Sequence, residues 1–252
     1  MLAIERRNAI LTKLTMEGKV IVADLSQEFD VTEETIRRDL EKLDKEGLAK
    51  KTYGGAVAKQ NLNIDLPNSV RKRSKGEIKQ YIAEKIGDMI HDGDYIMLDA
   101  SSTAIFVTKY IKNRKNITLI TNSVEILLEL ADKEDWNILS TGGNLKKGAL
   151  SLVGDCAKKM ISGFHVDLAV CSAKGIDISN GITDSNERDS LIKQAIFASA
   201  EKKILAIDST KFDKISFVKV CDFDAIDTIV TDSEPTKDWI DFLDKKEVEL
   251  IF

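Results

Sequence analysis

Two adjacent arginines lie in an acidic chain. The 252-residue sequence contains 37 Lys+Arg against 42 Asp+Glu, a formal net charge of −5, yet Arg37 and Arg38 occur together in VTEETIRRDLEKL, Val31 to Leu43. Arginine can pair bidentately with guanine or bind a phosphate. The same side chains could instead complement Glu33 and Glu34 at helical i,i+4 spacing. The residue types alone leave both interpretations open.

Polar residues follow three apolar runs that are typical of strands. In LDASSTAIF, residues 99–103 come after one run, and Thr121-Asn122-Ser123 and Thr141-Gly142-Gly143 follow two more. Hydroxyls and free backbone N–H groups at a helix N-terminus can hold a phosphate. Each stretch alone could also be an ordinary cap or turn. Three such loops at one edge of a sheet favour a ligand site, because ligands of open α/β folds bind at the carboxyl ends of the strands.

Charged residues later in the chain could complete such a site. Lys174, Asp184 and Glu187 precede Asp208 and Lys211, the last two in IDSTKF. A lysine after a strand end could hold a phosphate, and carboxylates could accept hydrogen bonds from sugar hydroxyls. Taken singly, each of these side chains is more commonly a solvated surface group.

The arginine pair belongs to residues 1–58, which we expect to form a small domain of three short helices and a hairpin. A second short helix, with Leu25 and Phe29, is expected after the β-like run Val20-Ile21-Val22. Apolar residues at helical spacing mark the first helix: Ile4, Ile10, Leu11 and Leu14.

The third helix is the one that carries the arginines. Thr32 is its expected N-cap, the stripe Ile36, Leu40 and Leu43 faces inward, and Gly47 ends it. A short helix followed by this one is a helix-turn-helix, in which the second helix enters the major groove of DNA. LAKKTYGGAVAK after it predicts a hairpin that acts as a wing. The residues expected to contact DNA are Thr32, Thr35, Arg37, Arg38, Lys50, Lys51 and Tyr53.

Beyond residue 58 the pattern changes. Residues 59–70 hold one of two prolines and little periodicity, and we expect them to be a linker. Residues 71–252 alternate helix and buried strand, which predicts an α/β domain with a mainly parallel sheet. A helix with Ile78, Ile82, Ile86 and Ile90 comes first. The expected strands are residues 95–98, 117–120, 137–140, 166–171, 203–208 and 227–232.

The segment TIRRDLEKLDKEGLAKKTYGGA closely resembles the DNA-binding signature of the DeoR family of bacterial transcriptional repressors. The resemblance implies a winged helix-turn-helix that binds operator DNA, with Asp39 holding an arginine in position. Thr32 stands where the family commonly has serine, and Lys51 where it commonly has arginine. Residues 1–60 contain 11 Lys+Arg and 11 Asp+Glu, so any DNA contact must come from local placement of charge.

The order DASST, TNS, TGG, GITD and DSTKF is similar to the effector domain of the same family, which resembles sugar-phosphate isomerases such as ribose-5-phosphate isomerase. The resemblance implies a repressor of sugar or polyol catabolism controlled by a small phosphorylated sugar. Ala104 and Cys171-Ser172 depart from the family pattern, so the pocket floor and the ligand could differ. The implied effector residues are Asp99, Ser101, Ser102, Thr103, Asn122, Gly142, Gly143, Glu187, Asp208 and Lys211.

Composition excludes several other classes. No apolar run approaches the roughly 20 residues that cross a bilayer, and MLAIERRNAI lacks the core of a secretory signal, so we expect a cytoplasmic protein without membrane contact. Three widely spaced cysteines and two histidines predict neither disulfides nor a metal or other cofactor.

An even-numbered homo-oligomer is expected, because helix-turn-helix proteins commonly read two half-sites. The competing function is a sugar-phosphate isomerase with an accessory DNA-binding domain, since fold does not decide activity.

Overall fold

The computed structural model describes residues 1–58, 70–71, 74–146 and 148–252. The chain folds as two compact units, Met1–Gly76 and Glu77–Phe252. The expected linker, residues 59–70, lies outside the described residues except for Val70, which is buried with the apolar core of the first unit. The domain limits drawn from the sequence therefore stay predictions.

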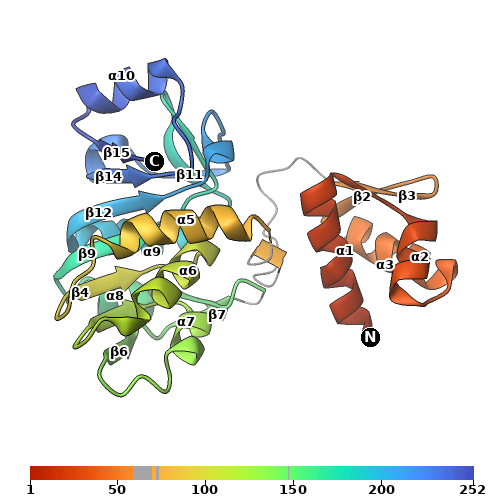
Figure 1. Ribbon diagram of the computed structural model, residues 1–252, viewed down its shortest axis with the longest axis horizontal. Helices are drawn as coiled ribbons and strands as arrows, with labels where there is room; N and C mark the ends of the chain where they lie inside the picture. Colours follow the sequence, from red (N-terminus) through yellow and green to blue (C-terminus); the bar gives the residue numbers. More distant parts are fainter. Residues whose placement is uncertain (59–69, 72–73, 147) are drawn as a thin grey trace. The chain divides into compact units, whose positions relative to one another are not determined.

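The N-terminal unit packs three helices against an antiparallel sheet in the order β1-β3-β2 (Figure 1). Its elements are α1 (Ala3–Glu17), β1 (Lys19–Ile21), α2 (Val22–Phe29), α3 (Glu33–Lys45), β2 (Ala49–Thr52) and β3 (Gly55–Ala58). The predicted winged helix-turn-helix is thereby confirmed. Its core contains the predicted Ile10, Leu11, Leu14, Leu25, Ile36, Leu40 and Leu43. Ile4 is an exception, because it is 56% exposed.

The turn of the wing requires glycine at two positions. Gly54 has a φ angle of +91°, in the left-handed region that side chains disfavour. Gly55 pairs with Ile21 across the sheet, and a Cβ atom there would lie 2.1 Å from the carbonyl oxygen of Val20. A side chain at position 55 would therefore push β1 and β3 apart.

The C-terminal unit is built on a seven-stranded sheet in the order β15-β14-β12-β9-β4-β5-β6, with every pairing parallel. The strands are β4 (Tyr95–Leu98), β5 (Thr118–Thr121), β6 (Asn137–Ser140), β9 (Val166–Cys171), β12 (Ala200–Ala206), β14 (Thr228–Val230) and β15 (Glu249–Ile251). The predicted parallel α/β sheet is confirmed. The sequence patterns predicted six of these strands and missed β15.

Helices cover both faces of this sheet, each over its own apolar core (Figure 1). On one face lie α5 (Gly76–Gly87), α6 (Ser102–Tyr110) and α7 (Val124–Glu129). On the other lie α8 (Asp155–Ile161), α9 (Glu187–Ala198) and α10 (Lys237–Lys245). Three short 3-10 helices are η1 (Ile111–Asn113), η2 (Ser209–Lys211) and η3 (Phe223–Ala225). None of the helices that the structure describes is long and apolar enough to cross a membrane.

Two small antiparallel sheets, which the sequence patterns did not indicate, complete the unit. One is the pair β7 (Asn144–Lys146) and β8 (Ser151–Val153), and the other is β10 (Gly175–Asp177), β11 (Gly181–Asp184) and β13 (Val218–Cys221). Both position polar residues. Asp184 ends β11, and Lys146 of β7 forms an ion pair of 2.5 Å with Asp189 of α9.

Candidate functional sites

The helix α3 begins where the sequence predicts. The Thr32 hydroxyl accepts a hydrogen bond from the Thr35 backbone N–H at 3.3 Å, which satisfies one of the free donors of the first turn. The stripe Ile36, Leu40 and Leu43 is completely or almost completely buried. This burial fixes the rotation of the helix, so that Arg37 and Arg38 lie on its exposed side.

In the free protein both arginines are paired with glutamates. Arg37 Nη2 lies 2.6 Å from Glu33 Oε2, and Arg38 Nε lies 3.3 Å from Glu34 Oε1. The arginine side chains are 49% and 77% exposed. The intrahelical pairing that the sequence left open is therefore present. Exposed pairs of this kind contribute only about 0.2–1 kcal/mol each, so a bidentate base contact worth about 1–3 kcal/mol can still draw either arginine to DNA.

The acid of the Thr-Ile-Arg-Arg-Asp sequence pairs with a different helix. Asp39 is buried and accepts from Arg6 Nε of α1 at 2.5 Å, with Arg7 Nη1 at 3.5 Å. The arginine that Asp39 holds is thus Arg6, and the pair joins α1 to α3. Sequence reasoning missed Arg6. Its position four residues before Ile10 places it on the buried side of α1, and this spacing is the signal that could have found it.

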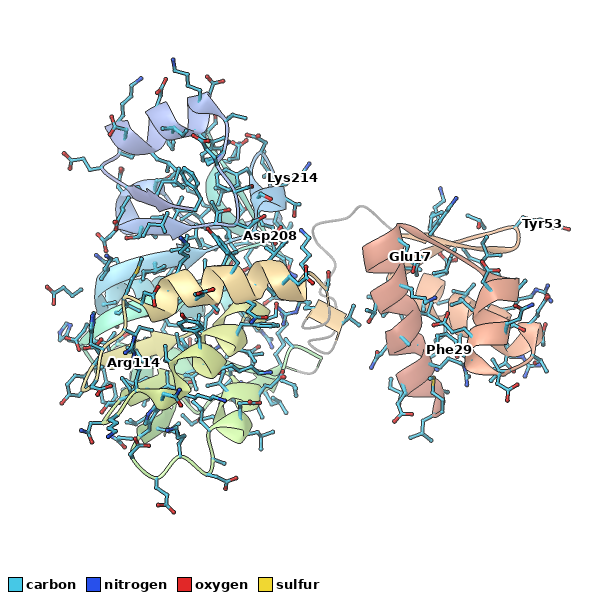
Figure 2. The ribbon with its side chains drawn as sticks, viewed as in Figure 1. Glu17, Phe29, Tyr53, Arg114, Asp208 and Lys214 are labelled. Carbon is cyan, nitrogen blue, oxygen red and sulfur yellow. The ribbon has the colours of Figure 1, made fainter. Side chains whose placement is uncertain are left out.

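The wing exposes its predicted residues. Lys50, Lys51 and Tyr53 are all exposed, and Tyr53 lies at the tip of the hairpin, pointing away from the rest of its unit (Figure 2). The backbone N–H of Lys51 donates to Asp44 Oδ1 at 3.4 Å, which connects the wing to the end of α3. A completely exposed tyrosine contributes nothing to a core, so its ring is available for contact with another molecule.

At the C-terminal edge of the parallel sheet, three charged side chains meet. Lys193 Nζ lies 2.5 Å from Asp184 Oδ2 and 3.4 Å from Asp99 Oδ2, and it donates to the Ser172 carbonyl at 2.5 Å. Asp99 also accepts from the backbone N–H groups of Ser101 at 3.0 Å and Ser172 at 3.1 Å. We call Asp99, Asp184 and Lys193 the buried triad, because their side chains are 2%, 5% and 12% exposed.

Opposite charges hold the buried triad in its ionised form. Burial by itself would lower the pKa of Lys193, but the charges of Asp184 and Asp99 outweigh it, so the pKa stands above its ordinary value. Burial would likewise raise the pKa of Asp184, and the nearby Lys193 ammonium lowers it instead. Lys193 is therefore neutralised by carboxylates and is not a free cation for a phosphate.

Sequence reasoning missed Lys193. Asp99 was predicted, and Asp184 was noted as a charged residue near the site, but the lysine that joins them was not. Lys193 lies three residues from both Ser190 and Ile196 and four from Phe197, all of which are buried. A lysine in a buried helical stripe is the signal that could have found it, because buried lysines are rare unless paired.

The predicted hydroxyl loops lie at the same edge of the sheet. Ser101 caps α6, because its hydroxyl accepts a hydrogen bond from the Ala104 N–H at 3.1 Å. The interpretation of this stretch as an ordinary helix cap is thus correct for Ser101. Ser102 and Thr103 are buried, and neither hydroxyl forms a hydrogen bond with another residue in the part of the chain that the structure describes. Asn122 donates from Nδ2 to the Leu152 carbonyl at 3.1 Å, which fixes the amide orientation. Its Oδ1 atom is buried without a hydrogen-bond donor among the described residues.

The remaining predicted residues are distributed around that edge. Gly143 has a φ of +101°, and a Cβ atom there would lie 2.7 Å from the Val153 carbonyl oxygen, so the loop needs glycine. Asp208 is buried and caps η2, accepting from the Thr210 N–H at 3.2 Å, and Lys211 ends that turn. Glu187 is exposed at the start of α9, and no hydrogen bond or ion pair of the described residues joins it to the buried triad.

A cavity of about 270 Å³ lies between the N-terminal parts of α8 and α9. It is next in sequence to Gly143 and Glu187 but contains none of the predicted effector residues. Its lining residues are Asn144, Val153, Gly154, Asp155, Lys158, Arg188, Leu191 and Ile192. Over the described ranges, no cluster of side chains suited to a metal ion occurs.

Both units match known protein families. Residues 6–61 match the DeoR-like helix-turn-helix domain, and residues 74–233 match the DeoR C terminal sensor domain. A Bacillus subtilis protein described as an uncharacterized HTH-type transcriptional regulator, YulB, is 36% identical over 99% of this chain and 96% of its own length. The L-fucose operon activator of Haemophilus influenzae is 33% identical over 90% of this chain and 91% of its own.

A solved structure of ribose 5-phosphate isomerase from Plasmodium falciparum shares 17% identity with the chain. It covers 54% of this chain and 52% of that one with a TM-score of 0.40. This likeness is too low to indicate a shared activity.

Proposed function

This chain belongs to the DeoR family of transcriptional regulators, and we propose that it represses a sugar or polyol catabolic operon in the cytoplasm under the control of a phosphorylated intermediate. The observation that carries the proposal is the orientation of α3. Its apolar stripe is buried while Arg37 and Arg38 are exposed on the other side, as a helix that reads a major groove requires.

The effector site that we propose lies over the buried triad. Its carboxylates and the unpaired Oδ1 atom of Asn122 would accept hydrogen bonds from sugar hydroxyls. The phosphate would bind the backbone N–H groups of Ser102 and Thr103 and the hydroxyls of residues 101–103 at the start of α6, because the Ser101 N–H already donates to Asp99 and Lys193 is already neutralised. Gly142, Gly143, Glu187, Asp208 and Lys211 would line the rest of the site.

The same geometry supports binding rather than catalysis. An aldose–ketose isomerase needs a carboxylate basic enough to abstract a carbon-bound proton. Asp184 is paired with Lys193 at 2.5 Å, and its pKa is lowered, so it is a poor general base at neutral pH. Because the matched relatives are transcriptional regulators as well, we propose that the protein is not an enzyme. A homo-oligomer with an even number of subunits would present two α3 helices to two half-sites.

The test combines three measurements on the full-length chain. Thermal unfolding with a panel of sugar phosphates and the matching free sugars identifies the effector, because a ligand of the folded state raises the melting temperature. Anisotropy of labelled duplexes then measures DNA affinity with and without that compound, and an isomerase assay uses the same compound. Turnover without sequence-specific DNA binding would establish the isomerase alternative instead.

A further inference from the structure

The first turn of α3 places an acid beside each exposed arginine of the helix. Glu33 and Glu34 are 48% and 61% exposed, and each lies one helical turn before its partner, Arg37 or Arg38. Both glutamates are thus on the part of the helix that would approach DNA, where a carboxylate repels phosphate. Acids in a first turn are also favoured by the helix dipole, and here they lie within reach of the arginines as well.

We infer that Glu33 and Glu34 determine specificity by holding Arg37 and Arg38 away from non-operator DNA, an inference that rests on the proposed function. On any duplex the arginine has a choice between its own glutamate and a phosphate. Both are anions at a single exposed site, so exchanging one for the other gains little. An operator guanine offers two acceptors in one plane and draws the arginine off its glutamate.

The charge balance of the unit supports this distinction. Residues 1–60, which include every helix and strand of the winged helix-turn-helix, contain 11 basic and 11 acidic residues, so no net charge of these elements holds them on DNA. Non-specific affinity is almost entirely electrostatic and depends on cations that are free to neutralise phosphates. Pairing Arg37 at 2.6 Å and Arg38 at 3.3 Å removes two such cations until a base contact competes for them.

A glutamate-to-glutamine change keeps the shape of the side chain and removes the charge. Glu33→Gln and Glu34→Gln should each raise affinity for a scrambled duplex about two- to five-fold, the range that exposed ion pairs are worth as equilibrium constants. Operator affinity should rise less, so the ratio of operator to scrambled affinity should fall. Glu28→Gln is the matched control, because Glu28 pairs with Lys13, and neither is among the predicted DNA contacts.

Removal of any acid strengthens DNA binding, so the decisive measurement is a double-mutant cycle. In an Arg37→Ala background, Glu33→Gln should no longer change the ratio, because there is no arginine left to release. Affinities are measured by anisotropy at one fixed salt concentration with full-length protein. The duplexes are a sequence that the wild-type chain selects from a random pool and its scrambled counterpart. Circular dichroism of each variant checks that the total helical content is unchanged.

The possible outcomes distinguish a failure of this inference from a failure of the proposed function on which it rests. An unchanged ratio in both glutamine variants, or an equal effect of Glu33→Gln with and without Arg37, would overturn the inference and leave the regulator intact. A wild-type chain that selects no sequence from the pool would overturn both.

Discussion

The two units use ion pairs in opposite ways. On α3, Arg37 and Arg38 pair with glutamates of the same helix, and all four side chains are about half or more exposed. In the C-terminal unit, Lys193 joins Asp99 and Asp184, and none of the three side chains is more than 12% exposed. Exposed pairs exchange partners at little cost in free energy, whereas breaking a buried pair leaves a buried charge with neither a counter-charge nor water around it. The first arrangement suits contact with changing partners, and the second fixes a site.

Removing the lysine of the buried triad should have the largest effect. Lys193→Ala leaves two buried carboxylates without their counter-charge and should lower the free energy of unfolding by about 3–5 kcal/mol. Both tryptophans, Trp136 and Trp239, belong to this unit, so fluorescence during urea unfolding reports on it alone. Lys203→Ala is the control, because Lys203 pairs with Asp227 at the surface and should cost at most about 1 kcal/mol. Equal losses in the free energy of unfolding for Lys193→Ala and Lys203→Ala would contradict the distinction between buried and exposed pairs.

The N-terminal unit contains a buried pair of its own, and breaking it should have the next largest effect. Asp39→Ala leaves Arg6 buried between α1 and α3 without its carboxylate partner. The change should lower the free energy of unfolding of this unit by about 3 kcal/mol, at the lower end for buried pairs. Loss of helical circular dichroism at lower urea, ahead of the tryptophan signal, is the expected observation. Arg7→Ala should cost less, since its contact with Asp39 is 3.5 Å long. A larger loss for Arg7 than for Asp39 would disprove the assignment.

On the exposed side of α3, substitutions should change binding and not folding. Arg37→Ala and Arg38→Ala should each weaken operator binding by about 1–3 kcal/mol without a change in the melting temperature. Lys45→Ala, which removes a cation from the far end of the same helix, should matter less. Gel shifts at one salt concentration measure this. Normal affinity in both arginine variants would show that α3 does not read the operator.

The effector site should affect regulation rather than DNA affinity as such. Ser102→Ala and Lys211→Ala should keep operator binding without ligand but lose the change that the sugar phosphate causes, a coupling of typically about 1–3 kcal/mol. The double change Lys158→Ala and Arg188→Ala alters the neighbouring cavity and should keep the response. If the cavity variant loses the response and the other two retain it, the effector binds between α8 and α9.

The smallest effect expected is that of pH on the buried triad. The pKa of Asp184 is lowered by Lys193, so its stabilising contribution is complete above its unfolded value of about 3.9 and is lost as pH falls through the folded value. The pKa of Lys193 is raised, so its contribution is complete below about 10.4 and is lost at higher pH. The free energy of unfolding of this unit, measured by tryptophan fluorescence in urea, should therefore change least between about pH 5 and pH 9. A steep change near pH 7 would show that another group controls this unit.

Local patterns in the sequence determined most of the elements of both units. The Thr32 cap and the stripe Ile36, Leu40 and Leu43 predict α3 because cap and stripe are each set by neighbours within two helical turns. Mainly apolar runs likewise predict β4 and β9, since a strand buried on both faces is apolar along most of its length. The short strands β7, β10 and β13 have no such pattern, and they form because of what they pair with.

Which charges meet was decided by the tertiary structure alone. Asp99 directly follows the central strand β4, Asp184 ends β11 and Lys193 lies on α9. Only the packing of α9 on the sheet brings Lys193 within 3.4 Å of both carboxylates. Arg6 and Asp39 are likewise 33 residues apart. The pairing of Arg37 with Glu33 is local, and its i,i+4 spacing allowed it; the burial of the apolar stripe decided that both side chains lie on the exposed side of α3. Charge pairing depends on distance and burial in space, and one-dimensional spacing specifies neither for residues on different elements.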